Sequence, residues 1–321
     1  MRPLTSLPRS IHIPIHKHNH TRRLLTPLQP PHHLRPITMS APAATPTPDG
    51  AAKKASQIPK GKTELKILML HGYTQSGPVF SSKTKALAKL LTKAVSPAPY
   101  NLHPTLLYPT APHRLRPSDI PGYAPTGAGG ATAEEEEEDD SDNWGWWRKD
   151  EATNTYRGVE TCMQTIATAI AEAGGVDGVL GFSQGAALGA LVAAALEEPL
   201  RTPTPDAEHH APWLAQLRAA NHGEPLKFCV VYSGFYAVPD DLQWLYSSPI
   251  STPTLHFLGS LDTVVEESRS QRLVERCVDP TVVVHPGGHY VPVAKDWVLV
   301  LIGWLRKQYE PKTTKKDDDD L

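Results

Sequence analysis

Residues 178–196 read GVLGFSQGAALGALVAAAL and combine three signals in one stretch. An apolar run ends at Phe182, Ser183 stands between Gly181 and Gly185, and a run rich in alanine and leucine follows. This order predicts a buried strand, a sharp turn and a helix. The glycines leave room for the serine to sit on a strained turn with its hydroxyl pushed into the open. We therefore take Ser183 as a candidate nucleophile.

Two backbone amides near this serine are candidates for holding an oxyanion. Gln184 begins the predicted helix, where the first N–H groups have no helical partner and favour negative charge. An apolar strand over 67–70 runs into a loop bounded by glycines, in which the amide of Tyr73 can face the serine. An ordinary strand-to-helix connection remains the alternative for this loop.

Strands alternate with helices along the chain. We expect strands over 67–70, 105–108, 176–182, 227–232, 253–258 and 281–285, and helices over 81–94, 156–173, 186–196, 213–220, 266–277 and 293–307. Such alternation predicts an α/β fold with a mostly parallel, doubly wound sheet flanked by helices, in a single catalytic domain over 61–309. Reacting groups gather at the carboxyl ends of the strands of such a sheet.

Two further polar residues follow strands at that edge. Asp262 and His289 come after the last two predicted strands, which gives the chain order Ser, Asp, His. A serine hydroxyl is a poor nucleophile at neutral pH, so His289 would accept its proton while Asp262 holds the other ring nitrogen. The rival candidates, which lie near the same loops, are His285, Asp279, Asp296, Glu266 and Glu267.

Composition narrows the classes of partner and compartment. The 321 residues include 32 Lys and Arg against 34 Asp and Glu, so the formal net charge of -2 does not indicate a nucleic-acid partner. Cys162, Cys229 and Cys277 are far apart in apolar segments, which favours reduced thiols over disulfides or a metal site. No apolar run reaches the length of a membrane span. We expect a soluble protein that needs no cofactor or metal and has a small-molecule substrate.

Several segments differ in composition from the predicted domain. Residues 1–60 are rich in proline and histidine and contain no acidic residue before Asp49, which predicts a disordered basic extension. Mitochondrial targeting is the alternative, and so is a true start at Met39. Residues 124–143 form a low-complexity acidic insertion, residues 200–226 a candidate lid, and residues 310–321 a charged disordered tail. We expect a cytoplasmic protein and leave a nuclear fraction open.

Aromatic and loop residues near these strand ends are candidates for the substrate pocket. A tryptophan-rich segment follows the acidic insertion, and it could either line an acyl pocket or anchor the loop to the core. The pocket candidates are His71, Gly72, Trp146, Trp147, Phe235 and Tyr290.

The ordered motifs resemble a known family. HGYTQSG (71–77), YPTAPH (108–113), a tryptophan-rich segment before YRGVE (156–160), GVLGFSQGAALGALV, VVYSGFY (230–236), LGSLDTVV (258–265) and HPGGHYVP (285–292) follow one another as in the FSH-type serine hydrolases, relatives of the ovarian-cancer-associated candidate hydrolase. The resemblance covers about residues 66–306. It implies an α/β-hydrolase fold, a triad of Ser183, Asp262 and His289, and esterase or thioesterase action on acyl chains. The N-terminal 60 residues, the glutamate run and the acidic tail are departures, and no function is carried over to them.

Three functions are compatible with these patterns. The first is hydrolysis of carboxylic esters of short to medium acyl chains. The second is a thioesterase acting on acyl groups carried by coenzyme A or by a carrier protein, since the acyl-enzyme chemistry is the same. The third is a non-catalytic scaffold with a hydrolase fold, although the presence of all three catalytic residue types counts against it.

Overall fold

The computed structural model describes residues 58–116, 119–120, 142–150, 152–205 and 211–310. Almost all of the predicted N-terminal extension and charged tail lies outside these ranges, as does most of the acidic insertion. Within them, no helix is long and apolar enough to cross a membrane.

The core of the domain is a six-stranded sheet in which every pairing is parallel. Its strands, in the order in which they lie side by side, are β10 (Thr281–His285), β9 (Thr254–Gly259), β8 (Phe228–Tyr232), β7 (Gly178–Phe182), β1 (Thr63–Leu70) and β2 (Leu102–Leu107). The predicted parallel, doubly wound α/β sheet is therefore confirmed.

The direction of winding reverses beside β1. The chain passes from β1 to β2 on one side, returns to β7 on the other side, and then continues outward through β8, β9 and β10. Ligand sites of open α/β sheets lie at such a reversal, beyond the carboxyl ends of the strands. Here that place lies between the loops that follow β1 and β7.

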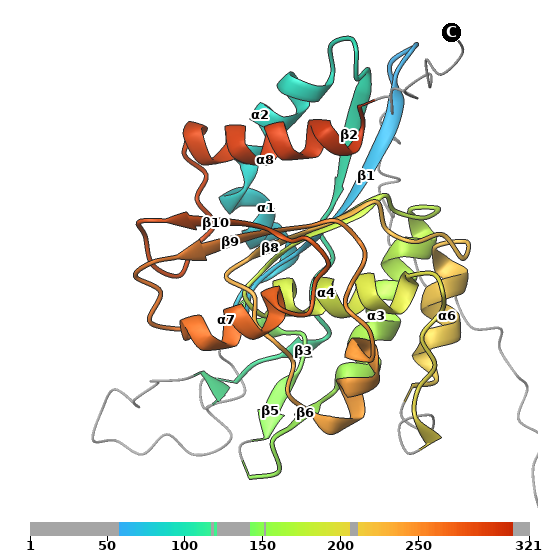
Figure 1. Ribbon diagram of the computed structural model, residues 1–321, viewed down its shortest axis with the longest axis vertical. Helices are drawn as coiled ribbons and strands as arrows, with labels where there is room; N and C mark the ends of the chain where they lie inside the picture. Colours follow the sequence, from blue (N-terminus) through green and yellow to red (C-terminus); the bar gives the residue numbers. More distant parts are fainter. Residues whose placement is uncertain (1–57, 117–118, 121–141, 151, 206–210, 311–321) are drawn as a thin grey trace, which may run out of the picture. The chain divides into compact units, whose positions relative to one another are not determined.

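Helices cover both faces of the sheet (Figure 1). One face carries α1 (Gly77–Lys83), α2 (Lys85–Val95) and α8 (Lys295–Gln308), and the other carries α3 (Val159–Glu172), α4 (Gln184–Leu196), α6 (Trp213–Ala220) and α7 (Glu267–Val274). Every residue of α4 is buried. This explains why α4 is apolar on all sides, since it packs on the sheet and also contacts α6.

The turn from β7 into α4 depends on close backbone contact. A Cβ on Gly185 would lie 2.4 Å from the carbonyl oxygens of both Leu70 and His71, and a Cβ on Gly181 would lie 2.3 Å from the carbonyl oxygen of Gly185. Ser183, between them, has φ +54°. The start of α4 therefore lies directly against the end of β1, and glycine is required for that approach.

Two predicted helices have different boundaries. The segment expected as one helix over 81–94 is two helices, α1 and α2, that meet at Thr84, whose hydroxyl donates to the carbonyl of Phe80. The segment expected over 156–173 begins instead with strand β6 (Thr155–Arg157), which pairs with β5 (Arg148–Asp150). Gly158, at φ +90°, separates β6 from α3. A side chain at this position would collide with the ring of His113, since a Cβ would lie 2.2 Å from it.

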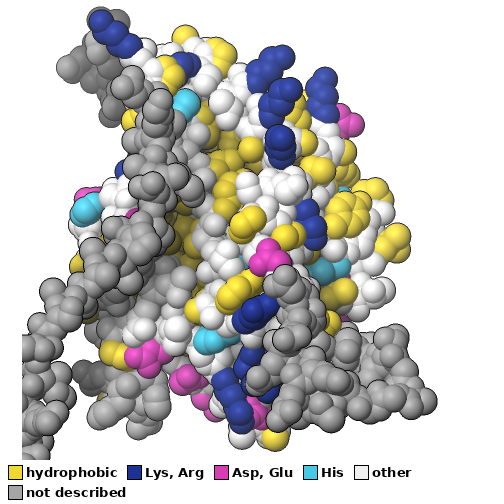
Figure 2. All heavy atoms as spheres, turned by 180° about the vertical axis from the view of Figure 1, so that it is seen from behind, with side chains coloured by type: hydrophobic (Ala, Val, Ile, Leu, Met, Phe, Trp, Pro, Cys, Tyr) yellow, Lys and Arg dark blue, Asp and Glu magenta, His cyan; other side chains and the backbone are white. Residues whose placement is uncertain are grey.

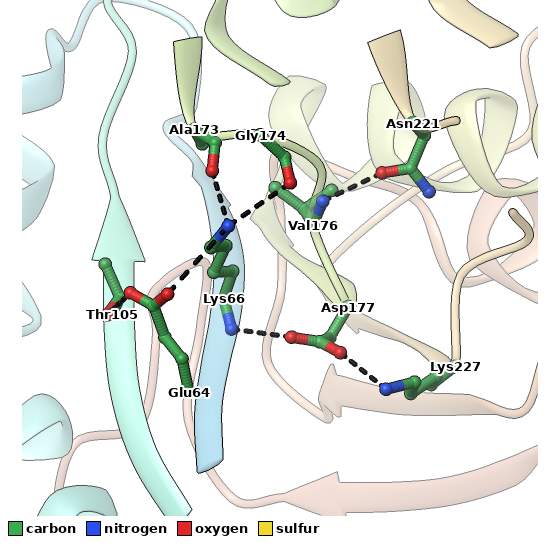
Figure 3. Close-up of polar contacts among 9 residues, drawn as sticks. All are labelled: Glu64, Lys66, Thr105, Ala173, Gly174, Val176, Asp177, Asn221 and Lys227. Atoms are coloured by element: carbon green, nitrogen blue, oxygen red, sulfur yellow. Dashed lines mark hydrogen bonds and ion pairs between the residues drawn. The ribbon is translucent and has the colours of Figure 1, made fainter. Parts of the chain in front are cut away.

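The described part of the segment expected as a lid packs against helix α3. Its helix α6 buries Trp213, Leu214 and Leu217 beside α3 (Figure 1). Asn221, just after α6, accepts a 2.8 Å hydrogen bond from the amide of Val176, which precedes β7 (Figure 3). The helix of this segment thus packs along α3, and its end at Asn221 lies at the amino end of β7, whereas Ser183 follows the carboxyl end of that strand.

Polar contacts tie the strands together at this amino edge (Figure 3). The carboxylate of Asp177 accepts hydrogen bonds from the Lys66 amide at 2.8 Å and from the Lys227 ammonium at 2.6 Å. One side chain therefore joins β1 to the segments that lead into β7 and β8. These groups satisfy one another, so we assign them a structural role.

Replacement of Gly185 tests the backbone contact. Gly185→Ala should destabilise the fold by about 3 kcal/mol, the upper end of the usual cost of overpacking, because the new methyl group meets two fixed carbonyl oxygens. Gly189→Ala is the matched control in the same helix, where the methyl group would meet side chains alone, those of Val179 at 3.1 Å and Cys229 at 3.9 Å. It should change stability by no more than about 1 kcal/mol. Urea unfolding measures both, and equal effects would contradict the role of Gly185.

A second prediction concerns the buried His256 on β9. It is 1% exposed, and burial lowers its pKa from 6.5 to about 4. As the pH falls, His256 therefore takes up a proton at a higher pH in the unfolded chain than in the folded chain. The neutral ring of His256 should contribute about 3 kcal/mol to the free energy of unfolding above pH 6.5, and this contribution should be lost as the pH falls from 6.5 toward 4. In His256→Gln, urea unfolding across this range should show a shallower pH dependence than wild type; parallel curves would contradict the assignment.

Candidate active site

Ser183 occupies the turn between β7 and α4 at the reversal point of the sheet. Its amide donates a 2.8 Å hydrogen bond to the carbonyl of Tyr232 on the neighbouring strand, and the residue is 8% exposed. The strained φ and this hydrogen bond fix the direction of the side chain.

Three side chains from different loops form a hydrogen-bonded row. Nε2 of His289 lies 2.9 Å from Oγ of Ser183, and Nδ1 of the same ring lies 2.8 Å from Oδ2 of Asp262. Both distances are within normal hydrogen-bond range. The structure therefore brings together the serine, histidine and aspartate that the sequence analysis selected.

Asp262 is held as a carboxylate. Its Oδ1 accepts 2.9 Å hydrogen bonds from the amides of both Val264 and Val265. Burial by itself would raise the pKa of Asp262, but these amides and the His289 ring outweigh it and lower the pKa below its usual value. A charged carboxylate is thus oriented toward Nδ1, which defines the tautomer that leaves Nε2 free to accept a proton from Ser183.

None of the rival residues joins this row. His285 is buried at the end of β10, and its ring lies against those of Tyr290 and Trp297. The remaining rivals make no hydrogen bond to the serine or to His289 within the described part of the chain: Asp279, Asp296, Glu266 and Glu267.

The loop after β1 lies beside the serine. A Cβ on Gly72 would be 3.4 Å from that of Ser183 and 2.8 Å from the Phe182 ring. The amides of Tyr73 and Gln184 make no hydrogen bond to another described residue. Both are therefore available to donate to a group bound at Ser183.

His71 fixes the backbone of this loop. Its ring is fully buried, with Nδ1 donating to the carbonyl of Gly72 at 2.8 Å and Nε2 accepting from the amide of Ala111 at 3.0 Å. Burial lowers its pKa to about 4, so the ring stays neutral near neutral pH. The sequence predicts His71 as a pocket residue, but its contacts are those of a residue that positions the loop.

The side chain of Gln184 connects the elbow to the tryptophan-rich segment. Its Oε1 accepts from the amide of Trp146 at 2.8 Å, and its Nε2 donates to the carbonyl of Trp147 at 2.9 Å. The Trp146 indole in turn donates to the carbonyl of His71 at 2.8 Å. The sequence predicts a role for the backbone amide of Gln184 alone, because periodicity gives no signal for this role of its side chain.

Residues at the end of the predicted acidic insertion also hold the loop. The amide of Thr74 donates to the carbonyl of Trp144 at 2.9 Å, and Ser76 donates its hydroxyl to Asp142. Asn143 accepts from the amide of Leu115 at 2.8 Å. The last two residues of the predicted insertion, 142 and 143, therefore belong to the packed domain.

Of the remaining pocket candidates, only Tyr290 lines a cavity at the site. That cavity has a volume of about 300 Å³ and is lined by Gln75, Phe80, Lys83, Phe182, His289, Tyr290 and Val291. Trp146 and Trp147 are buried in the core, where Trp147 stacks on Tyr156. Gly72 packs on Phe182, and Phe235 is buried beside Arg269. The sequence analysis missed the residues on α1, which follow no strand end.

Within the ranges that the structure describes, no group of three or more His, Cys, Asp or Glu side chains could hold a metal ion. A serine hydrogen-bonded to a histidine, with two free amides nearby, is an arrangement suited to acyl transfer.

The chain is similar in sequence to known proteins. The family model described as "Serine hydrolase (FSH1)" matches residues 61–300. The Saccharomyces cerevisiae protein "Family of serine hydrolases 2" is 32% identical over 244 residues, which cover 75% of this chain and 97% of that protein. "Esterase OVCA2" of Xenopus tropicalis is 31% identical over 259 residues, which cover 78% and 92%.

A third relative is longer. The Schizosaccharomyces pombe protein named "Dihydrofolate reductase" is 34% identical over 232 residues, which cover 71% of this chain but only 44% of that protein. The chain thus spans less than half of that relative's length. The match to the family model and the relatives covered along most of their length show that the chain belongs to the FSH1 family of serine hydrolases.

Proposed function

We propose that the chain hydrolyses carboxylic esters of short to medium acyl chains through an acyl-enzyme on Ser183. The observation that carries the proposal is the continuous hydrogen-bonded row from Asp262 through His289 to Ser183, with distances of 2.8 and 2.9 Å. The names of its relatives, esterase and serine hydrolase, support the same reaction class.

The first half of the reaction forms the acyl-enzyme. Oγ of Ser183 attacks the ester carbon while its proton passes to Nε2 of His289. The tetrahedral intermediate then collapses, the bond to the alcohol oxygen breaks, and His289 returns the proton to that oxygen. Asp262 stabilises the positively charged ring between these steps.

Water completes the reaction by the same route. His289 takes a proton from the water as it attacks the acyl-enzyme, and then returns a proton to Ser183 as the acid leaves. In both halves, the amides of Tyr73 and Gln184 donate to the oxyanion. Loss of one such donor typically costs about 10² to 10³ in turnover.

The size of the cavity beside His289 supports small substrates. Its volume of about 300 Å³ is at the lower end of the range for ligand pockets. The same acyl-enzyme chemistry would also act on a thioester of coenzyme A or of a carrier protein. Comparison of kcat/KM for matched oxygen esters and thioesters decides between the two leaving groups.

Replacement of Ser183 tests the proposal. Ser183→Ala should lower kcat for a short-chain ester by at least about 10⁴-fold, because it removes the hydroxyl that is hydrogen-bonded to Nε2 of His289. Circular dichroism and urea unfolding serve as controls for folding. Unchanged hydrolysis by folded Ser183→Ala protein would rule out the mechanism.

A further inference from the structure

The cavity beside His289 contains polar groups that the reaction steps above do not use. Phe80, Phe182 and Val291 provide apolar walls, while Gln75 and Lys83 add one amide and one ammonium group. A mainly apolar cavity with few polar groups is the usual composition of a site for a small molecule. The two polar groups therefore indicate what kind of molecule fits.

Gln75 offers a buried acceptor. Its side-chain oxygen Oε1 is inaccessible to solvent and accepts no hydrogen bond from any described residue. Buried carbonyl oxygens in folded proteins nearly always have a donor, because an unpaired one loses its hydrogen bonds to water. Because Gln75 also lines the cavity, rotation of its side chain would present Oε1 to an N–H or O–H group on a bound molecule, which would supply that donor.

Lys83 provides positive charge at the same cavity. It is the exposed last residue of α1, and it forms no ion pair within the described ranges. Neither α1 nor α2 contains an acidic residue, and α2 adds three lysines that do not line the cavity: Lys85, Lys89 and Lys93. Figure 2 shows basic side chains grouped at the upper right of this face, on the side of α2. The potential here favours an anion.

His289 identifies which part of a substrate occupies the cavity. Its ring lines the wall and lies 4.9 Å from that of Phe182, measured between ring centroids. In ester cleavage the histidine gives its proton to the oxygen of the departing alcohol, so the alcohol part must lie on the side of His289. Ser183, which carries the acyl group, is not among the residues that line the cavity.

We propose that this cavity binds the leaving group of the ester, and that this alcohol carries a hydrogen-bond donor for Gln75 and an anionic end for Lys83. The inference rests on the proposed function and specifies its substrate class. As the acyl-enzyme forms, a bond forms between the Ser183 oxygen and the acyl carbon, and the bond between that carbon and the alcohol oxygen breaks. The electron pair stays on the alcohol oxygen, which takes the proton from Nε2 of His289.

The charge preference is tested with acetate esters of ω-hydroxy carboxylic acids of increasing chain length and of the matching carboxamides. Wild type should prefer the carboxylates, and Lys83→Gln should lower kcat/KM for the carboxylates alone by about threefold to fivefold, the modest effect expected of an exposed charge. Lys85→Gln is the matched control, because this exposed lysine does not line the cavity. It should retain the preference.

The hydrogen-bond preference is tested with acetate esters whose alcohol part contains an amide N–H and with their N-methylated counterparts. Wild type should prefer the N–H compounds by about threefold to tenfold in kcat/KM, and Gln75→Met should abolish that preference. Equal activity of wild type on both members of each pair would overturn this half of the inference.

Other results separate failure of the inference from failure of the proposed function. Hydrolysis of the neutral esters that depends on Ser183, together with an unchanged kcat/KM of Lys83→Gln for the carboxylate esters, would overturn the inference alone. An effect of Lys83→Gln on esters that carry the carboxylate on the acyl side instead would also overturn it, since the cavity would then bind the acyl group. Hydrolysis that persists in Ser183→Ala would overturn the proposed function itself.

Discussion

The structure depends on one close contact, that of the start of α4 with the end of β1. Gly185 makes it possible, because any side chain there would collide with the carbonyl oxygens of Leu70 and His71. The contact brings the turn after β7 beside the loop after β1, at the point where the winding of the sheet reverses. The loop that contains Tyr73 thereby lies beside Ser183, although the two are far apart in the sequence. The arrangement of the candidate site follows from the packing of two backbone segments.

A buried hydrogen-bond network supports that contact. Gln184 holds the tryptophan-rich segment through two hydrogen bonds, and Trp146 donates to the carbonyl of His71. The His71 ring donates to the carbonyl of Gly72 in the loop and accepts from the amide of Ala111 after β2. Each group is buried, so loss of one partner leaves another unsatisfied in a region of low dielectric constant. Such a network keeps the loop in one conformation before a substrate binds. Preorganised donors of this kind need no rearrangement as negative charge develops on an oxyanion.

The sequence predicted the sheet and the three side chains of the row well, because both leave local signals. Apolar runs of strand length alternate with helical periods, and Ser183, Asp262 and His289 each follow such a run. The contacts around the row could not be predicted in this way. Trp146 is as hydrophobic as any pocket residue, and only the fold shows that it lies in the core. Likewise, α6 has the composition of a surface helix, and its place against α3 is determined by tertiary packing. Lys83 was missed because its role depends on a cavity that residues from α1, β7 and the loop after β10 form together.

The central claim is that His289 activates Ser183 as a nucleophile. A fluorophosphonate probe reacts with an activated serine, so the most direct measurement is labelling of the purified protein followed by mapping of the modified peptide. The account predicts labelling at Ser183 that is nearly abolished in His289→Ala protein of unchanged fold. Labelling at another residue, no labelling of folded wild-type protein, or undiminished labelling of His289→Ala would contradict it.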